Sequence, residues 1–379
     1  MGTPVACGID VLRADSFALL KAKRVGLITN HTGVAADGVA TIDLLHQSEG
    51  VELVRLFCPE HGLRGTAENG IKVEDGKDPK TGLPVVSLYG ESRKPTAEHL
   101  AGLDVLVFDI QDIGARFYTY IATMGLAMEA AAEAGIGFVV LDRPNPIGGH
   151  RVEGPLPGGE LSFVCPHDLP IRHGMTVGEL AQMFRAERGL DQLDLKVVKM
   201  DGYRREMWFD DTGVPWHAPS PNIPDLDSAI VYPGIGMLEF LNVSVGRGTE
   251  APFRTVGAPF INGAALAAEL VAAELKGVEF VAIDFVPSKS KFVGEQCSGV
   301  RIRVTNRDRC QPLEIASVIA GHLAREHREA VLFDEKIGVL LNHPKTAEQL
   351  QDRTVALNDL WEADEESFLR RRKAFLFYR

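Results

Sequence analysis

Residues 105–142, VLVFDIQDIGARFYTYIATMGLAMEAAAEAGIGFVVLD, decide the fold of this 379-residue chain. The segment opens with a continuous apolar run at 105–109 and closes with another at 137–142, and the stretch 119–134 between them has the length of a helix. Apolar runs without alternation are typical of parallel strands that are covered on both faces. We therefore predict a strand–helix–strand unit of a parallel sheet.

The same alternation continues on both sides of this segment. Further apolar runs lie at 24–29, 51–57, 84–88 and 195–200, and helix-length stretches lie at 41–47 and 176–187. The helix at 176–187 opens with a threonine that is followed three residues later by a glutamate, which is the spacing of a capping box. Alternating strands and helices predict an α/β fold with a doubly wound, mostly parallel sheet.

A proline-rich connector divides the chain. The sequence PWHAPSPNIP at 215–224 holds four prolines, which neither a helix nor a central strand accommodates. We therefore expect one domain at 1–222 and a second at 223–379. In the second, the pattern predicts strands at 278–286 and 299–305 and helices at 264–276, 314–326 and within 346–374. The basic run RRRK at 370–373 is expected to be a solvated helix end, because cations suit a helix C-terminus.

Composition excludes several classes of protein. The 40 basic and 52 acidic side chains leave a net charge of −12, which opposes binding to nucleic acid. The five cysteines form no CxxC pair and predict neither a disulfide framework nor a zinc site. No window reaches the roughly 18–20 apolar residues of a membrane span. The N-terminus shows no signal peptide, so we expect a cytoplasmic protein, or a secreted or periplasmic one if the sequence is trimmed.

Polar side chains follow four of the expected strands. In an open parallel sheet, ligands bind beyond the carboxyl ends of the strands, so these side chains are candidates for a site. They are Asn30 after the first strand, Glu60 and His61 after the second, Asp109, Gln111, Asp112, Arg116 and Tyr118 after the fourth, and Asp142, Arg143 and Asn145 after the fifth.

Among these candidates, Glu60 has the context of a general acid. Proline precedes it and His61 and a glycine follow it, and a carboxyl that is partly desolvated there would have a raised pKa. In the second domain, Arg247 lies between two glycines, and its planar guanidinium suits a carboxylate on a ligand. Two interpretations without a ligand stay open: Asp142 and Arg143 form a structural salt bridge, and Arg247 lies solvated in a surface turn.

The motifs of cofactor and metal sites are missing. The chain holds no GxxxxGK[ST] loop, no GxGxxG after its first strand and no HExxH helix, so we expect neither a bound cofactor nor a metal.

Seven longer motifs resemble those of the exo-β-N-acetylmuramidase family, bacterial enzymes that remove terminal N-acetylmuramic acid from peptidoglycan fragments. The resemblance implies a Rossmann-like N-terminal domain, a smaller C-terminal α/β domain, and a site in the cleft between them. The motifs are GLITNHTG (26–33), LFCPEHGLRG (56–65), TGLPVVSLYG (81–90), VFDIQDIGARFYTY (107–120), LDRPNPIGG (141–149), PSPNIP (219–224) and NVSVGRGT (242–249).

The resemblance implies a glycoside hydrolase of cell-wall breakdown or recycling, with Glu60 in the catalytic PEHG motif. Glu60 would protonate the glycosidic oxygen while the bond breaks with oxocarbenium character. Asp109 or Asp112 would act as a nucleophile or as a base on water, or the 2-acetamido oxygen of the sugar would attack. The alternatives are a muropeptide-binding protein without catalysis and a metal-assisted hydrolase of another acidic sugar.

The implied substrate also assigns binding roles. N-acetylmuramic acid carries a lactyl carboxylate, which Arg116, Arg143 or Arg247 would bind. Tyr118 and Tyr120 would stack on the sugar ring or donate a hydroxyl hydrogen bond. The expected partner is a cell-wall sugar, with no nucleic acid and no membrane span, and the oligomeric state is left open.

Overall fold

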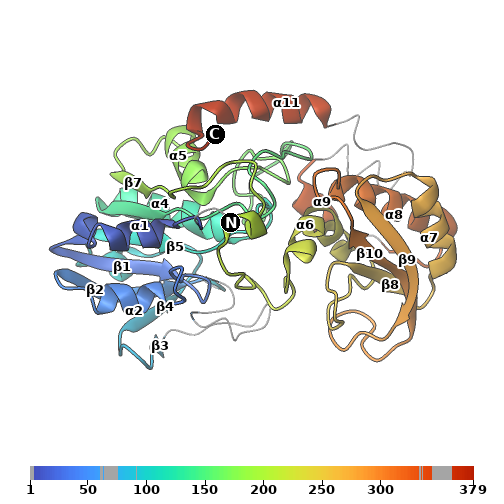
Figure 1. The fold of residues 1–379 in the computed structure, drawn as a ribbon, viewed down its shortest axis with the longest axis horizontal. Helices are drawn as coiled ribbons and strands as arrows, with labels where there is room; N and C mark the ends of the chain where they lie inside the picture. Colours follow the sequence, from blue (N-terminus) through green and yellow to red (C-terminus); the bar gives the residue numbers. More distant parts are fainter. Residues whose placement is uncertain are drawn as a thin grey trace.

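The structure is a computed structural model of the chain. It describes residues 4–59, 63, 76–90, 92–332, 334, 336–343 and 361–379. Two sheets lie side by side in it, a large one in the N-terminal half and a small one in the C-terminal half (Figure 1).

The large sheet has seven strands in the order β3-β4-β2-β1-β5-β6-β7. All neighbouring pairs are parallel except β3–β4, which is antiparallel. The six parallel strands therefore follow the doubly wound order of a Rossmann-like sheet, and the direction of winding reverses between β1 and β5. The strands are β1 (Lys23–Thr29), β2 (Val51–Cys58), β3 (Gly76–Lys77), β4 (Pro84–Ser87), β5 (Val105–Asp109), β6 (Gly137–Leu141) and β7 (Leu195–Val198).

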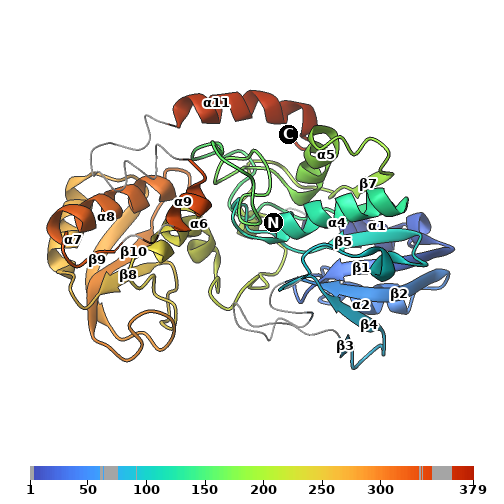
Figure 2. The same ribbon diagram turned by 180° about the vertical axis from the view of Figure 1, so that it is seen from behind.

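Helices cover both faces of this sheet. Alternate residues of each strand point to opposite faces, so Val105 and Val107 of β5 pack with α1 and α2, while Leu106 and Phe108 pack with α3, α4 and α5. Figure 1 shows α1 and α2 in front of the sheet. Figure 2, the view from the opposite side, shows α4 on the other face. The helices are α1 (Gly8–Ala14), α2 (Thr41–His46), α3 (Ala97–Leu100), α4 (Tyr120–Ala134) and α5 (Val177–Glu187).

The C-terminal half is built on a three-stranded antiparallel sheet in the order β8-β10-β9. Its core merges with that of the α4–α5 face into one apolar cluster, so the two halves bury a shared interior. The elements are α6 (Leu226–Ile235), β8 (Thr255–Ala258), α7 (Gly263–Ala272), β9 (Val278–Phe285), β10 (Cys297–Val304), α8 (Pro312–Glu326), α9 (Lys336–Leu341) and α11 (Glu362–Arg371).

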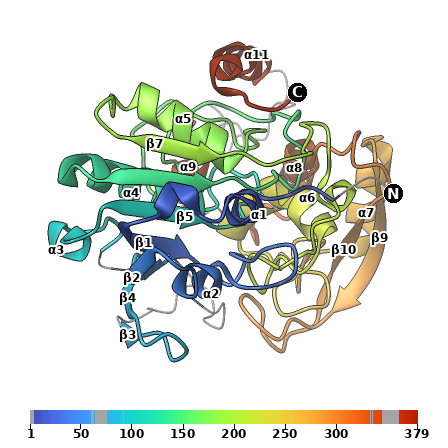
Figure 3. The ribbon, with the colours of Figure 1, turned by 60° about the vertical axis from the view of Figure 1, so that its left-hand side comes forward.

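The C-terminal segment returns to the N-terminal domain. Helix α11 lies above α5 at the top of the view (Figure 3), and the residues that follow it contact α5. No described helix is both long and apolar enough to cross a bilayer.

The fold class predicted from the sequence is confirmed. Five of the six predicted parallel strands end within one residue of their observed bounds, and Thr176 caps α5 with Glu179 in the predicted capping box. Six of the helices and strands named above were not predicted: α1, α3, α6, α9, β3 and β8.

The prediction of a solvated basic run at 370–373 was wrong for its two central residues. Arg371 pairs with Asp168, and Arg372, buried, donates hydrogen bonds to the carbonyl oxygens of Gly149 and Gly174. The helix does end in this run, but the cations dock on the N-terminal domain.

Candidate active site

The carboxyl ends of the central strands meet at one edge of the large sheet. Thr29 at the end of β1 lies opposite Asp109 at the end of β5, and Cys58 at the end of β2 lies opposite Ser87 of β4. The predicted site residues that follow these strands are thus brought to a common edge. Glu60 and His61, which follow β2 in the sequence, lie outside the described residues.

Asp109 and Arg143 form a closed ion pair. Arg143 Nε and Nη2 donate to the two carboxylate oxygens of Asp109 at 2.5 and 2.9 Å, and Thr41 Oγ1 also donates to Oδ2. Arg143 Nη2 donates further to the Val34 carbonyl oxygen. Both side chains are buried, and this pairing raises the pKa of Arg143. The arrangement argues against the expected roles, since Asp109 is saturated with donors and Arg143 has its charge neutralised.

Asp142 also serves the fold. Its carboxylate accepts four hydrogen bonds, and its burial raises its pKa to about 7. The donors are the Arg143 and Gly178 backbone amides, Thr176 Oγ1 and Tyr378 Oη, at 2.7–3.0 Å. The carboxylate therefore ties the end of β6 to the start of α5 and to the C-terminal tail, instead of facing a ligand.

The two amides at this edge hold the loops together. Gln111 Nε2 donates to the carbonyl oxygens of Asp112 and Pro144, both at 2.7 Å. Asn145 Nδ2 donates to the Met175 carbonyl oxygen and its Oδ1 accepts from the Ile147 amide. Both side chains were expected to bind a ligand, but they form hydrogen bonds with backbone groups instead. The spacing of residues in a sequence does not reveal such partners.

Arg116 is an internal anchor and not a ligand-facing cation. It is fully buried, and its two terminal nitrogens donate to four carbonyl oxygens at 2.6–3.1 Å, those of Pro155, Leu169, Leu340 and Leu341. Burial lowers its pKa. Because Leu340 and Leu341 end α9, the guanidinium fixes that helix C-terminus to the N-terminal domain.

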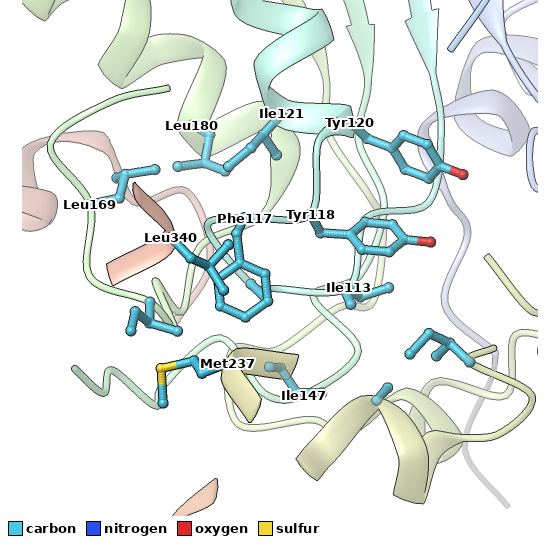
Figure 4. Close-up of a cluster of buried hydrophobic side chains, with 14 of the residues drawn as sticks. Ile113, Phe117, Tyr118, Tyr120, Ile121, Ile147, Leu169, Leu180, Met237 and Leu340 are labelled. Carbon is cyan, nitrogen blue, oxygen red and sulfur yellow. The ribbon is translucent and has the colours of Figure 1, made fainter. Parts of the chain in front are cut away.

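A cavity of about 420 Å³ lies where loops of the two halves meet, and it contains the aromatic part of the site. Tyr118 and Tyr120 lie in its wall with ring centroids 4.9 Å apart, and Figure 4 shows the two rings projecting the same way. Burial, with Tyr120 and Tyr232 nearby, raises the pKa of Tyr118 well above its usual range, so its phenol stays protonated. The wall also includes Tyr89, Arg93, Ser162, Phe163, Ser220, Asn222, Tyr232, Arg247 and Phe253.

A second cavity of about 480 Å³ adjoins the first, and both share Asn222 and Arg247. It is lined by Thr249, Lys289 and Ser290 among others. The described residues that line either cavity include no aspartate or glutamate. In a protein with a net charge of −12, such a lining favours an anionic ligand.

Arg247 is held rigidly where the cavities meet. Its Nε and Nη2 donate to the two carboxylate oxygens of Glu239 at 2.5 and 2.9 Å, and its guanidinium lies 5.1 Å from the Phe253 ring centroid. The side chain is 17% exposed. Of the three arginines considered from the sequence, Arg247 alone lies in the wall of the first cavity, with its charge balanced by Glu239.

Asp112 and Asn30 are buried and each keeps one polar atom without a hydrogen bond to a described group, namely Asp112 Oδ1 and Asn30 Nδ2. The other Asp112 oxygen accepts from the Gly114 amide at 2.7 Å and lies 3.6 Å from His173 Nε2. Within the described part of the chain, no group of three His, Cys, Asp or Glu side chains could hold a metal ion.

Several cavity residues were not assigned a role from the sequence. Tyr89 and Asn222 lie within two of the quoted motifs, TGLPVVSLYG and PSPNIP, but the sequence offered no chemical reason to assign them a role. The sequence does not indicate a role for Arg93 or Phe163, because these residues are far apart in the chain and come into contact through folding.

Comparison with known proteins covers almost the whole chain. Two family models match, described as exo-β-N-acetylmuramidase NamZ, N-terminal, at residues 25–227, and exo-β-N-acetylmuramidase NamZ, C-terminal, at residues 230–378. The peptidoglycan β-N-acetylmuramidase NamZ of Bacillus subtilis (strain 168) is 50% identical over 311 residues, which are 82% of this chain and 75% of that protein.

Two crystal structures of DUF1343 family proteins from Bacteroides fragilis are also similar. One is 38% identical with a TM-score of 0.94 and covers 100% of both chains. The other is 30% identical with a TM-score of 0.80 and covers 100% of this chain and 99% of its own.

Proposed function

This chain belongs to the exo-β-N-acetylmuramidase family, and from that premise we propose that its aromatic cavity holds the terminal N-acetylmuramic acid of a peptidoglycan fragment. The enzyme is an exo-acting glycoside hydrolase that releases this sugar from the non-reducing end. The observation that carries the proposal is the meeting of Tyr118, Asn222 and Arg247, from three separate family-like motifs, around one cavity.

The cavity suits an acidic amino sugar. Its volume of about 420 Å³ is in the range of small-molecule sites. Tyrosine rings offer an apolar face to the sugar ring and a hydroxyl to its polar substituents. The cations of the wall, without lining carboxylates among the described residues, suit the lactyl carboxylate.

We assign Glu60 the role of general acid. It follows Pro59, which is buried directly after the end of β2, at the sheet edge from which the cavity loops also start. As general acid, Glu60 would donate its proton to the glycosidic oxygen as the bond to the anomeric carbon breaks. The leaving sugar then departs as a neutral alcohol.

The ion pair of Asp109 reduces the number of candidates for the second catalytic group. Because Asp109 is closed off by Arg143 and Thr41, the remaining choices are Asp112 and the 2-acetamido oxygen of the substrate. Asp112 is itself buried, outside the lining of both cavities, and it is better suited to orient a group than to attack. We therefore favour attack by the acetamido oxygen. An N-trifluoroacetyl substrate, whose carbonyl oxygen is a weaker nucleophile, would then react much more slowly.

The first experiment is 4-nitrophenol release from 4-nitrophenyl β-N-acetylmuramide by the wild type and Glu60→Gln, with and without EDTA. We expect turnover that survives EDTA and falls by about 10²–10⁴-fold in the variant, the usual contribution of a general acid. Glu52→Gln is the matched control, because Glu52 is an exposed glutamate of β2, and we expect this variant to keep the activity of the wild type.

Binding of a MurNAc-GlcNAc disaccharide to Glu60→Gln, measured by calorimetry, separates catalysis from recognition. Retained binding with lost turnover supports the assignment of Glu60. A wild type that binds the disaccharide and never releases sugar would instead be a muropeptide-binding protein, and activity lost in EDTA would indicate a metal-assisted hydrolase.

A further inference from the structure

One cation of the first cavity has no carboxylate partner in the part of the chain that the structure describes. Arg116 is spent on carbonyl oxygens, Arg143 on Asp109, and Arg247 on Glu239. Arg93 also lines the cavity and is exposed, and it forms no ion pair with any residue that the structure describes. No described carboxylate therefore neutralises its positive charge.

The guanidinium of Arg93 is held in place by stacking. Its central carbon lies 4.3 Å from the centroid of the Phe163 ring, and Phe163 is itself part of the cavity wall. Stacking restricts the long side chain without using its N–H groups, which all lie in the plane of the guanidinium. The N–H groups at the edge of the guanidinium thus stay available to donate two parallel hydrogen bonds to a carboxylate.

The same cavity wall contains a hydroxyl group next to Phe163 in the chain. Ser162 precedes Phe163 in the chain, and both line the cavity. Ser162 Oγ is covered from solvent and makes no hydrogen bond with any described group. A covered hydroxyl without a partner is costly unless a ligand satisfies it, so its place in the wall of the same cavity points to a polar ligand group.

We propose that Arg93, stacked on Phe163 and assisted by the Ser162 hydroxyl, binds the lactyl carboxylate and makes the enzyme specific for N-acetylmuramic acid over N-acetylglucosamine. These two sugars differ only in the lactyl group, so a residue that binds the lactyl carboxylate would distinguish N-acetylmuramic acid from N-acetylglucosamine. The inference rests on the proposed function, because it assumes that the terminal sugar occupies this cavity.

The test compares kcat/KM for 4-nitrophenyl β-N-acetylmuramide and for its uncharged lactyl methyl ester. In the wild type, we expect a preference of about 10–100-fold for the acid, as for a charge-assisted hydrogen bond. Arg93→Ala loses this preference through a raised KM for the acid, with kcat/KM for the ester unchanged. Arg93→Lys recovers part of it, because it restores the charge without the planar pair of donors.

Lys94→Ala is the matched control. Lys94 is the neighbouring cation, but it pairs with Glu133 and Glu129 and does not line the cavity. The same change of net charge there leaves the preference intact. Equal losses on acid and ester in Arg93→Ala, or an unchanged ratio, would overturn the inference.

Failure of the proposed function has a different signature. If the wild type hydrolyses neither substrate, the proposed hydrolase activity is wrong. The inference about Arg93 is then tested by measuring the binding of the free sugars. Calorimetry with N-acetylmuramic acid and N-acetylglucosamine then compares the wild type with Arg93→Ala. A preference for the acidic sugar that Arg93→Ala abolishes supports the inference, and a preference that the variant retains refutes it.

Discussion

Asp109, Asp142 and Arg143 show what a residue pattern reveals and what it conceals. Their position at the carboxyl edge of the sheet was predictable, because strand ends could be read from the apolar runs. Their partners were not, since a hydrogen bond depends on where a side chain points after folding. Asp109 and Arg143 neutralise each other, and Asp142 is held by neutral hydrogen-bond donors. The cavity is instead lined by tyrosines and by cations from other segments.

The ion pair of Asp109 and Arg143 predicts a stability effect. Removing one partner of a buried pair leaves an uncompensated charge, so Arg143→Met is expected to lower the free energy of unfolding by about 3–5 kcal/mol. Urea unfolding at pH 7 measures this. The double variant Asp109→Leu/Arg143→Met should be less destabilised than Arg143→Met alone. A stability within about 0.5 kcal/mol of the wild type in Asp109→Asn, with activity abolished, would instead point to a catalytic Asp109.

At the scale of elements, continuous apolar strands and the capping box of α5 were predictable because their signals are local. The missed elements lack such signals. Helix α6 contains Pro233, which normally argues against a helix. Strand β8 is a four-residue strand inside a glycine-rich stretch, and it pairs with β10 along the sheet and with Ser244 through an isolated bridge. The small sheet depends on contacts between distant segments, so its antiparallel order could not be read from the sequence.

Two capping boxes with different surroundings allow a matched comparison. Thr176 at the start of α5 is buried and also donates to Asp142 Oδ2, whereas Thr96 at the start of α3 is exposed. Thr96→Ala is expected to cost about 1 kcal/mol, the usual value of a cap. Thr176→Ala should cost about 2–3 kcal/mol, because it also removes a hydrogen bond to a buried carboxylate. The two urea midpoints compare them directly, and equal costs would mean that the bond to Asp142 contributes nothing.

The whole molecule is held together by contacts that cross between its two halves. Arg116 binds the end of α9, Trp208 Nε1 donates to Asp308, and Arg372 returns from the C-terminal helix to Gly149 and Gly174. Glu153 accepts a hydrogen bond from the Leu313 amide in the first turn of α8. The cavity therefore lies between parts that are fixed to each other, which preserves the placement of Tyr118 against Arg247.

Glu153 makes this junction sensitive to pH. Burial raises its pKa to about 7 from 4.5, while Arg172 and the Leu313 amide oppose the rise. A carboxyl whose pKa is higher in the folded state binds protons more tightly there than in the unfolded chain. Its stabilising contribution is thus complete below about pH 4.5 and is lost as the pH rises toward 7. The total loss is on the order of 3 kcal/mol.

Glu153→Gln isolates this contribution, because the amide keeps an acceptor for Leu313 and cannot ionise. The free energy of unfolding of the variant, relative to the wild type, is expected to increase between pH 5 and 8, as measured by urea unfolding at several pH values. Glu160→Gln, at an exposed position in the same segment, should show a difference that is independent of pH. If both differences stay flat, Glu153 is already ionised in the folded protein at pH 5. In that case the attraction of Arg172, 3.7 Å away, and the hydrogen bond at the helix start outweigh the cost of burying the charge where the two halves meet.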